Sequence, residues 1–256
     1  KMRIKKNCVL SLDKFIDESL YNKKLGYYMK SNPFGEKGDF ITAPNISILF
    51  SEMIGVWVVS FWESLNSPKQ FNLIELGAGN GEMMTILTGV FNKFPQFNSS
   101  CNIKILEKSK HLKKIQKQKI NNHKVKWLDD LKDLNNLPCI FIANEFFDAL
   151  PIKQFIKKKN RWHERYVKFN NQIKSEYLDI PFDITELEEQ LKFKISLKQN
   201  FIEYSPLTSE YLKDITSKIS LNNGGILIID YGYLNKKMKN TIQAVSKHKY
   251  TDVLNS

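Results

Sequence analysis

Residues 71–83 read FNLIELGAGNGEM, and this stretch decides the fold because an apolar run ends in three closely spaced glycines. The run is short and apolar enough for a buried strand, and residues 82–91 behind it read as a helix. Glycines at such a turn let backbone N–H groups approach a ligand without a Cβ in the way. The GxGxG spacing differs from the GxGxxG of dinucleotide-binding folds and from the GK[ST] of a P-loop. We therefore expect a ligand-binding turn that disfavours nicotinamide cofactors and nucleoside triphosphates.

Apolar runs and helical segments alternate on the C-terminal side of this turn. The strand-like runs are 71–76, 102–107, 124–127, 139–143 and 225–230, and we expect the last of them to be a buried strand. The helix-like segments are 82–91, 109–119 and 207–220. This alternation is typical of an α/β fold with a parallel, doubly wound sheet. Ligands of such sheets bind outside the carboxyl ends of the strands.

The N-terminal part of the chain reads as helical. Residues 11–22 have an amphipathic pattern behind a capping serine, and residues 46–64 are apolar almost throughout. The apolar stretch is short for a bilayer span and contains Glu52, so we interpret it as a core helix without membrane insertion. We expect residues 1–68 to form a helical cap that carries a substrate-side loop.

The second expected domain covers residues 69–256 and contains an insertion at about 151–205. Within the insertion, apolar and polar residues alternate on both sides of Asn170 and Asn171. This pattern predicts an antiparallel β-hairpin beside the sheet.

Composition narrows the class of protein. The chain has 256 residues, of which 42% are hydrophobic and 26% charged, as in ordinary globular proteins. Cys8, Cys101 and Cys139 are too few and too far apart for a disulfide scaffold or a zinc site, and the four histidines are scattered. We expect a reducing compartment and no metal.

The net charge of +12 suggests an anionic partner, but its make-up weakens that interpretation. The basic residues are almost all lysine, with arginine only at positions 3, 161 and 165. Arginine is the preferred reader of bases and phosphates. Nucleic-acid binding is therefore disfavoured.

Carboxylates accompany the glycine turn. Glu75 precedes it, and Glu107 ends the next strand, where an acidic side chain can accept both hydroxyls of a ribose. Asp129 follows the third strand and could accept from an adenine amino group, or could equally be a solvated turn residue. Together, these features resemble the S-adenosylmethionine site of class I methyltransferases.

The loop after the fourth strand indicates the acceptor. DNA and glutamine amino-methyltransferases carry [DN]PPY there, whereas this chain has Asn144 followed by Glu-Phe-Phe. Glu145 and Asp148 add negative charge that suits a guanidinium, which carboxylates can hold bidentately. Alternatively, Asn144 caps a short helix while the two phenylalanines pack in the core.

Five stretches give a more specific resemblance to the MidA-like family of S-adenosylmethionine-dependent methyltransferases, which includes a mitochondrial protein-arginine methyltransferase needed for respiratory complex I assembly. They are GDFITAPNIS (38–47), ELGAGNGEM (75–83), ANEFFDALPIKQF (143–155), GGILIIDYGY (224–233) and TIQAVSKHKYTD (241–252). The resemblance implies a Rossmann-like sheet and methyl transfer to arginine nitrogens of a protein, for which a complex I subunit is a candidate. The alternatives are a nucleic-acid methyltransferase and a non-catalytic assembly factor that binds S-adenosylmethionine.

Candidate site residues follow from these patterns and from the resemblance. For the cofactor they are Glu75, Gly77, Ala78, Gly79, Gly81, Glu107, Asp129 and Thr42; for catalysis Asn144, Glu145 and Asp148; and for the substrate Asp39, Asp230 and Tyr231.

Two departures from the family pattern are visible. Position 45 is Asn where the family usually has an acidic residue, and the chain ends at Ser256, soon after the fifth strand. The family continues through strands that complete a seven-stranded sheet, so we expect those C-terminal strands to be missing here. The expected location is the bacterial cytoplasm or, in a eukaryote, the mitochondrial matrix, and a homodimer is a further expectation.

Overall fold

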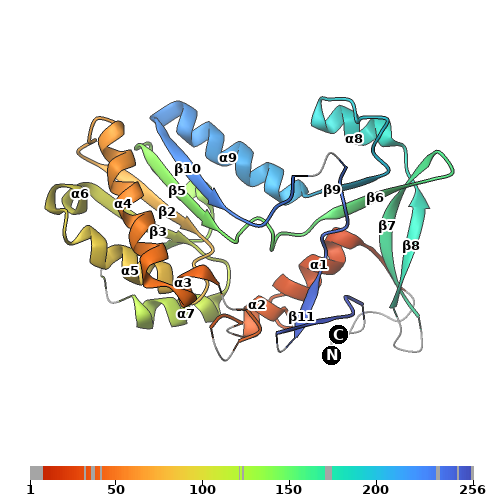
Figure 1. Ribbon diagram of the computed structural model, residues 1–256, viewed down its shortest axis with the longest axis horizontal. Helices are drawn as coiled ribbons and strands as arrows, with labels where there is room; N and C mark the ends of the chain where they lie inside the picture. The colour runs from red at the N-terminus through yellow and green to blue at the C-terminus, as the bar shows by residue number, and fades with distance from the viewer. Residues whose placement is uncertain are drawn as a thin grey trace. The chain divides into compact units, whose positions relative to one another are not determined.

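The computed structural model describes residues 8–31, 33–35, 38–40, 42–120, 122, 124–170, 175–234, 237–246 and 248–254 (Figure 1). Internal contacts divide the chain into two compact units. The antiparallel unit contains residues 1–27, 150–208 and 232–256, and the parallel-sheet unit contains residues 28–149 and 209–231. Residues 28–68, which the sequence assigns to an N-terminal cap, thus lie in the unit that holds the parallel sheet.

The parallel-sheet unit is built on five strands in the order β10-β5-β2-β3-β4. They are β2 (Phe71–Leu76), β3 (Cys101–Leu106), β4 (Lys126–Leu128), β5 (Cys139–Asn144) and β10 (Gly224–Ile229). Every neighbouring pair runs parallel, which confirms the predicted α/β sheet. The strand order reverses between β2 and β5, and a crevice at such a switch point is where ligands bind.

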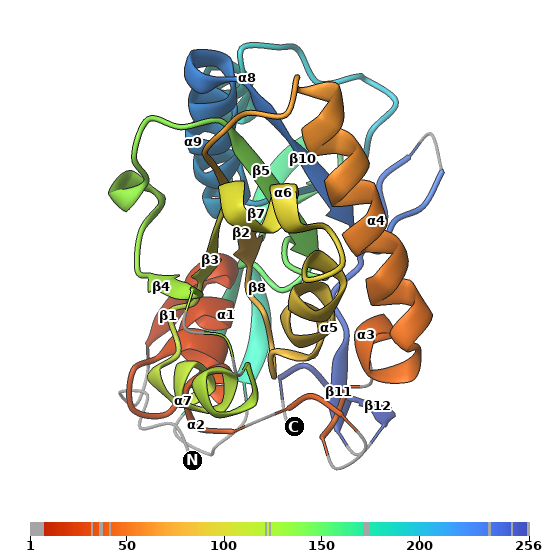
Figure 2. The same ribbon diagram turned by 90° about the vertical axis from the view of Figure 1, so that its left-hand side faces the viewer.

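Helices cover both faces of this sheet. Figure 2 shows α4 and α5 on one side of the strands and α9 on the other. Alternate side chains of β2 explain the arrangement, because Leu73 packs with the α4 and α5 side chains whereas Ile74 packs with those of α9. The helices of this unit are α3 (Ala43–Ile46), α4 (Ile48–Ser64), α5 (Glu82–Phe91), α6 (Pro95–Ser100), α7 (Lys110–Lys119), α9 (Pro206–Asn222) and the short 3-10 helix Leu131–Asp133.

Two sequence expectations need correction here. The helix expected over 46–64 begins at Ile48, because the backbone of Ser47 is extended and separates it from α3. The strand expected to be buried, β10, is half-buried, since it pairs only with β5 at the edge of the described sheet. Within the described ranges, none of the helices has both the length and the apolar character that a bilayer span requires.

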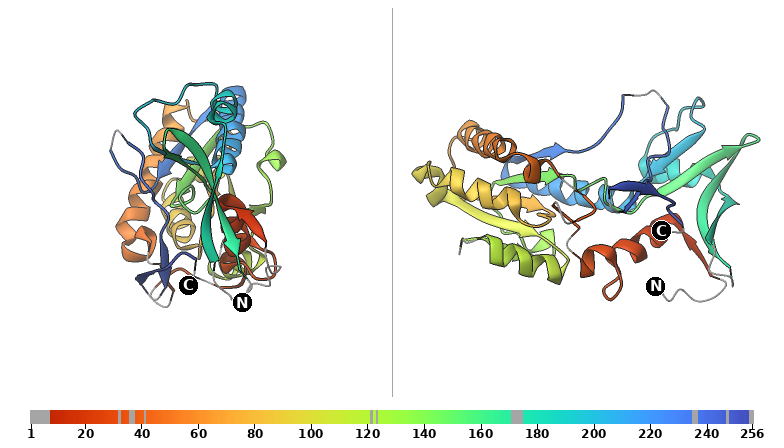
Figure 3. Two further views of the ribbon diagram at one scale, coloured as in Figure 1. Left: turned by 90° about the vertical axis from the view of Figure 1, so that its right-hand side faces the viewer. Right: turned by 60° about the horizontal axis from the view of Figure 1, so that its bottom comes forward.

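The antiparallel unit contains the predicted hairpin. β7 (Arg161–Phe169) pairs with β8 (Ser175–Pro181), and the two form a long curved pair (Figure 3). β7 also pairs with β1 and β6, and β6 pairs with β9. The other elements are β1 (Val9–Ser11), β6 (Lys153–Lys158), β9 (Phe201–Tyr204), β11 (Ala244–Ser246), β12 (Lys249–Thr251), α1 (Leu12–Tyr21) and α8 (Ile184–Leu191), while α2 (Tyr27–Lys30) begins at the boundary.

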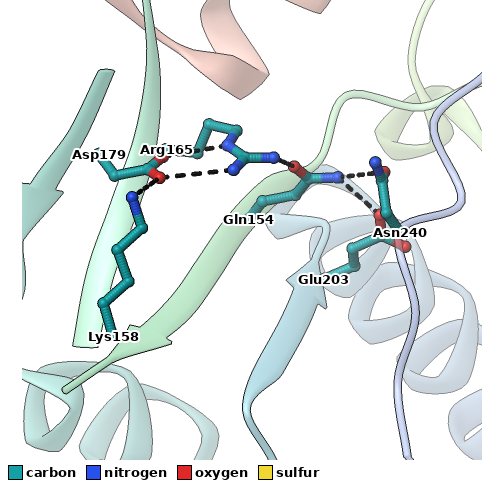
Figure 4. A network of polar contacts seen from close by, with 6 residues as sticks. All are labelled: Gln154, Lys158, Arg165, Asp179, Glu203 and Asn240. Carbon is teal, nitrogen blue, oxygen red and sulfur yellow. Dashed lines mark hydrogen bonds and ion pairs between the residues drawn. The ribbon is translucent and has the colours of Figure 1, made fainter. Parts of the chain in front are cut away.

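A polar network around the buried Gln154 joins five segments of this unit, which are β6, β7, β8, β9 and the segment around Asn240 (Figure 4). Gln154 is 1% exposed, and its Nε2 donates to Glu203 Oε1 (2.8 Å) and to Asn240 Oδ1 (2.7 Å). Its Oε1 accepts from Arg165 Nη1 (3.2 Å), and Arg165 Nε donates to Asp179 Oδ1 (3.0 Å). Gln154 therefore fastens the segment around Asn240 to β6 and β9.

Candidate active site

The glycine turn follows β2, as the sequence predicts, and its backbone requires glycine. Gly77, Gly79 and Gly81 have φ values of 65°, 52° and 82°, which lie in the left-handed region that side chains disfavour. An ideal Cβ on Gly77 would lie 2.8 Å from the ring of Phe146, and one on Gly79 would lie 3.3 Å from the ring of Phe34. The two rings line the turn, so a larger residue at either glycine would meet an aromatic ring as well as backbone strain.

Glu107 is linked to this turn through a glutamine. Its Oε2 accepts from Gln116 Nε2 (3.0 Å), and the same nitrogen donates to the carbonyl oxygen of Gly79 (2.9 Å). Its Oε1 accepts from the backbone N–H of Ser109 (2.8 Å), which precedes α7. Glu107 is buried, and burial raises its pKa, while the bonds from Ser109 and Gln116 oppose that rise. The carboxylate therefore lies beside the turn in a fixed orientation.

Glu75, at the end of β2, is the most perturbed acid of the site. Its side chain is 2% exposed, and its Oε2 has no hydrogen-bond partner among the described residues. Burial and then the nearby charge of Glu107 raise its pKa to about 8. A buried carboxyl group without a partner is costly, and such groups mark ligand sites.

These residues fit S-adenosylmethionine, the cofactor that the sequence resemblance implies. The unpartnered Glu75 oxygen suits the positive charge of its amino acid part, and Glu107 suits its ribose hydroxyls. The glycine turn provides the close backbone approach that the ligand needs. Within the described parts of the chain, no group of three or more His, Cys, Asp or Glu residues could hold a metal ion.

The loop of residues 145–148 follows β5, next to the turn. Glu145 has a φ of 49°, and its backbone N–H donates to the carbonyl of Ile229 on β10 (2.8 Å). The Oδ1 atom of Asn144 is buried and has no partner among the described residues. A buried acceptor of this kind can bind an N–H group of a ligand.

Three carboxylates and a tyrosine around this loop lie close enough to shift one another's pKa values. Burial, followed by the charges of Asp230 and Glu145, raises the pKa of Asp148 to about 6. Burial also raises the pKa of Glu145, although the backbone N–H of Ala43 donates to its carboxylate and opposes the rise. Burial and the charges of Asp148 and Glu145 raise the pKa of the Tyr28 hydroxyl far above its usual value. The structure thus brings both predicted acidic residues of this loop together with Asp230.

The segment that contains Thr42 reaches the glycine turn through asparagines. Asn45 Nδ2 donates to Thr42 Oγ1 (2.7 Å), and Asn45 Oδ1 accepts from Asn80 Nδ2 (2.8 Å). The amide at position 45, where the family pattern has an acid, therefore serves as donor and acceptor at once. Asp39 is half-buried in the loop before this segment.

Two predicted residues lie outside this set of contacts. The side chain of Asp129 is 86% exposed and pairs with Lys113 Nζ (2.5 Å), and this bond lowers its pKa. Tyr231 is 77% exposed, and the pKa of its hydroxyl is raised by Glu145 first and then by burial and by the other two carboxylates. Both side chains are exposed, in contrast to the buried side chains of Glu75 and Glu107.

Three residues of the site escape the sequence reasoning. Gln116 is fully buried and also accepts from the Trp127 indole N–H (2.8 Å), so it connects Glu107, the glycine turn and β4. Tyr28 and Phe34 stack with their ring centroids 6.0 Å apart. The sequence gives no signal for Tyr28 except that the stretch around it is rich in glycine and tyrosine. A polar residue four positions after Leu112, on the buried face of α7, was the available signal for Gln116.

Comparisons with known proteins agree with this geometry. A family model described as "Putative S-adenosyl-L-methionine-dependent methyltransferase" matches residues 53–256. "Protein arginine methyltransferase NDUFAF7, mitochondrial" from Xenopus laevis is 29% identical over 276 residues, which cover 98% of this chain and 63% of that protein. The human protein of the same name is 28% identical, with coverage of 98% and 62%. The chain thus spans less than two thirds of the length of these curated relatives.

A solved structure shares the fold. It is a Burkholderia thailandensis protein crystallised with S-adenosyl-homocysteine, and it aligns with a TM-score of 0.73 at 21% identity. The alignment covers 88% of this chain and 59% of that one. A second crystal structure of a Burkholderia thailandensis protein aligns with a TM-score of 0.69 at 21% identity and covers 89% of this chain and 58% of the other.

Proposed function

Because the chain belongs to this family of S-adenosyl-L-methionine-dependent methyltransferases, we propose that it binds S-adenosylmethionine and transfers the methyl group to an arginine of a protein. One observation carries the proposal: the acidic loop after β5 touches the glycine turn, since the ring of Phe146 fills the space beside Gly77. The cofactor site and the acceptor site are therefore neighbours at the switch point of the sheet.

The residues proposed to hold the cofactor are Glu75, Glu107 and the glycine turn. When bound, the cofactor supplies an electrophilic methyl group on a sulfonium. Glu75 would carry its proton at neutral pH without a ligand, because its pKa is about 8. A cation beside its unpartnered oxygen favours the ionised form, so we expect binding to release this proton.

The acceptor loop is proposed to hold a guanidinium. Glu145 and Asp148 provide the negative charge, and Asn144 Oδ1 provides a buried acceptor for an N–H group. A guanidinium is a poor nucleophile because its charge is delocalised and its pKa exceeds about 12. Carboxylates on one side fix the group and localise charge away from the attacking nitrogen. Asp148, which is ionised above about pH 6, can take the proton that this nitrogen releases.

The names of the relatives support the class of substrate. Curated proteins that are 28–29% identical carry the name protein arginine methyltransferase and the word mitochondrial. We therefore propose a protein substrate that presents an arginine, for which a respiratory complex I subunit is the candidate, and the mitochondrial matrix as the location in a eukaryote. The bacterial cytoplasm and a homodimer stay predictions.

A nucleic-acid substrate is the second candidate, and one surface favours it. Lys110, Lys113, Lys114 and Lys117 line a shallow hollow on one side of α7. Lysines on one helix face attract phosphates. They lie on a solvated helix, however, and the acidic loop after β5 repels a polyanion, so we rank this candidate below the protein substrate.

Labelled S-adenosylmethionine and cell extract provide the test. The chain should transfer label to protein, and acid hydrolysis should recover it as methylarginine. Glu145→Gln should lower transfer by about 10²-fold, because it removes a charge that orients the acceptor, while it still binds the cofactor. Glu63→Gln is the matched control, since Glu63 is exposed on α4 and should keep full activity. Label that is lost on nuclease treatment would contradict the proposal and favour the second candidate.

A further inference from the structure

Asp230 holds the acidic loop through the backbone. The residue comes directly after β10, and its Oδ2 accepts from the backbone N–H groups of Phe147 (3.0 Å) and Asp148 (3.2 Å). Its Oδ1 accepts from the backbone N–H of Tyr231 (2.8 Å). A carboxylate offers about four lone pairs, and backbone groups occupy three of them. Little capacity remains for a substrate.

The loop needs such an anchor because β5 ends immediately before it. The last pair of the β10–β5 ladder joins Ile229 to Asn144, and the next N–H, that of Glu145, still reaches Ile229. The backbone of Glu145 has a left-handed conformation, which is strained for a residue other than glycine. The N–H groups of Phe147 and Asp148 then depend on Asp230, which lies 83 and 82 residues further along the chain.

We propose that Asp230 is a positioning residue, which fixes the backbone of residues 145–148 so that Glu145 and Asp148 face the acceptor, and that it does not itself bind substrate. The proposal rests on the proposed function for its catalytic consequence, whereas the anchoring of the loop is independent of it. It also explains why an acidic residue suits this place: both oxygens accept, and an asparagine there would turn a donor toward at least one backbone N–H.

The charge of Asp230 gives a second effect that a purely structural residue would lack. After burial, it is one of the two charges that raise the pKa of Asp148, the other being Glu145. Among the described residues, Tyr28 and Tyr231 are further titratable groups close to these carboxylates. Removing the charge should lower the pKa of Asp148 from about 6, so the acid limb of the rate profile should move to lower pH.

Asp230→Asn tests both effects, with Asp133→Asn as the control because Asp133 is exposed and carries the same charge. Amide hydrogen exchange of Phe147 and Asp148 should be about 10-fold or more faster in Asp230→Asn and unchanged in the control. Methyl transfer should fall by about 10²-fold in kcat, with KM for an arginine peptide changed less than about 3-fold. The acid limb of the pH–rate profile should move to lower pH only in Asp230→Asn.

Two results would overturn the proposal. Unchanged exchange at both amides would show that Asp230 does not hold the loop, and a raised KM with unchanged kcat would make it a substrate-binding residue. If the parent chain methylates no arginine while the two amides still lose protection, the proposed function fails and the anchor stands. Should Asp230→Asn not fold, Asp230→Glu keeps the charge and displaces the carboxylate, so exchange should rise and kcat fall without the shift of the acid limb.

Discussion

At the scale of single residues, the site is marked by two buried oxygen atoms that have no hydrogen-bond partner among the described residues. Glu75 has a free oxygen in the interior, and Asn144 has a buried carbonyl oxygen without a partner among the described residues. Such groups destabilise the ligand-free fold, because their desolvation is not offset by a hydrogen bond. Function and stability therefore oppose each other at these positions.

Glu75→Gln should make the ligand-free chain more stable at high pH. The folded-state pKa of about 8 lies above the ordinary 4.5, so the native state binds more protons than the unfolded state between these values. Unfolding free energy therefore falls as pH rises through this window, and the substitution removes that fall. We expect the variant to gain about 3–4 kcal/mol over the parent at pH 8 relative to pH 5.

Urea unfolding of both chains at pH 5 and pH 8 measures this difference, and calorimetry should find that the variant has lost cofactor affinity. An equal difference in stability at the two pH values would show that Glu75 titrates normally and is not buried as described.

Much of the site could be predicted from the sequence where a residue's position along a strand sets its place. Glu75, Glu107 and Glu145 each stand at or just beyond the end of a parallel strand, and these ends meet at one edge. Gln116 and Phe34 could not be predicted in the same way, because their contacts with the glycine turn depend on how a helix and a distant loop pack. For Phe34 no local pattern indicates this packing, and for Gln116 the one signal is its place on the buried face of α7.

At the scale of elements, local patterns predicted the strands and helices of the parallel sheet well. The hairpin of β7 and β8 was also predicted, since its strands are adjacent in sequence and alternate clearly. β6 was missed although it forms a tight hairpin with β7, with Lys158 opposite Arg161. β9 was missed because it pairs with β6 across more than 40 residues, with Phe155 opposite Ile202. Pairing at that distance is decided by the folded chain and not by the segment itself.

For the apolar segment 48–64 too, the sequence predicts the element but not its contacts. Its inner face is buried, with Val58 and Trp62 in the core, as a core helix requires. Its outer side leaves Leu49, Met53 and Val56 exposed by 63%, 60% and 44%. A segment that is apolar on every side predicts burial but cannot indicate which side packs on the sheet.

The polar network of the antiparallel unit gives a prediction at this scale. Gln154→Ala should destabilise the unit by about 1–3 kcal/mol, because it removes a buried amide that bonds Glu203, Asn240 and Arg165. Gln118→Ala is the control, since Gln118 is exposed on α7 and should change stability by less than about 0.5 kcal/mol. Thermal or urea unfolding compares them, and equal stability of the two variants would show that the network contributes nothing.

At the scale of the whole molecule, the two units are interleaved along the chain. The antiparallel unit takes residues from the beginning, the middle and the end, and the parallel-sheet unit takes the stretches between them. All the residues proposed for the cofactor and the acceptor belong to the parallel-sheet unit. The sequence predicted an insertion at about 151–205 but placed the N-terminal boundary at residue 68, because residues 28–68 contact the sheet unit through packing that no local pattern reveals.

The central claim is that the glycine turn binds S-adenosylmethionine, and titration calorimetry of the full chain tests it most directly. The account predicts saturable binding to the parent chain and to Gly89→Val, whose side chain would meet open space on α5. Gly79→Val should bind at least about 10²-fold more weakly, because valine meets the ring of Phe34 and strains a left-handed backbone. Equal affinity of all three chains, or no binding by the parent, would contradict the account.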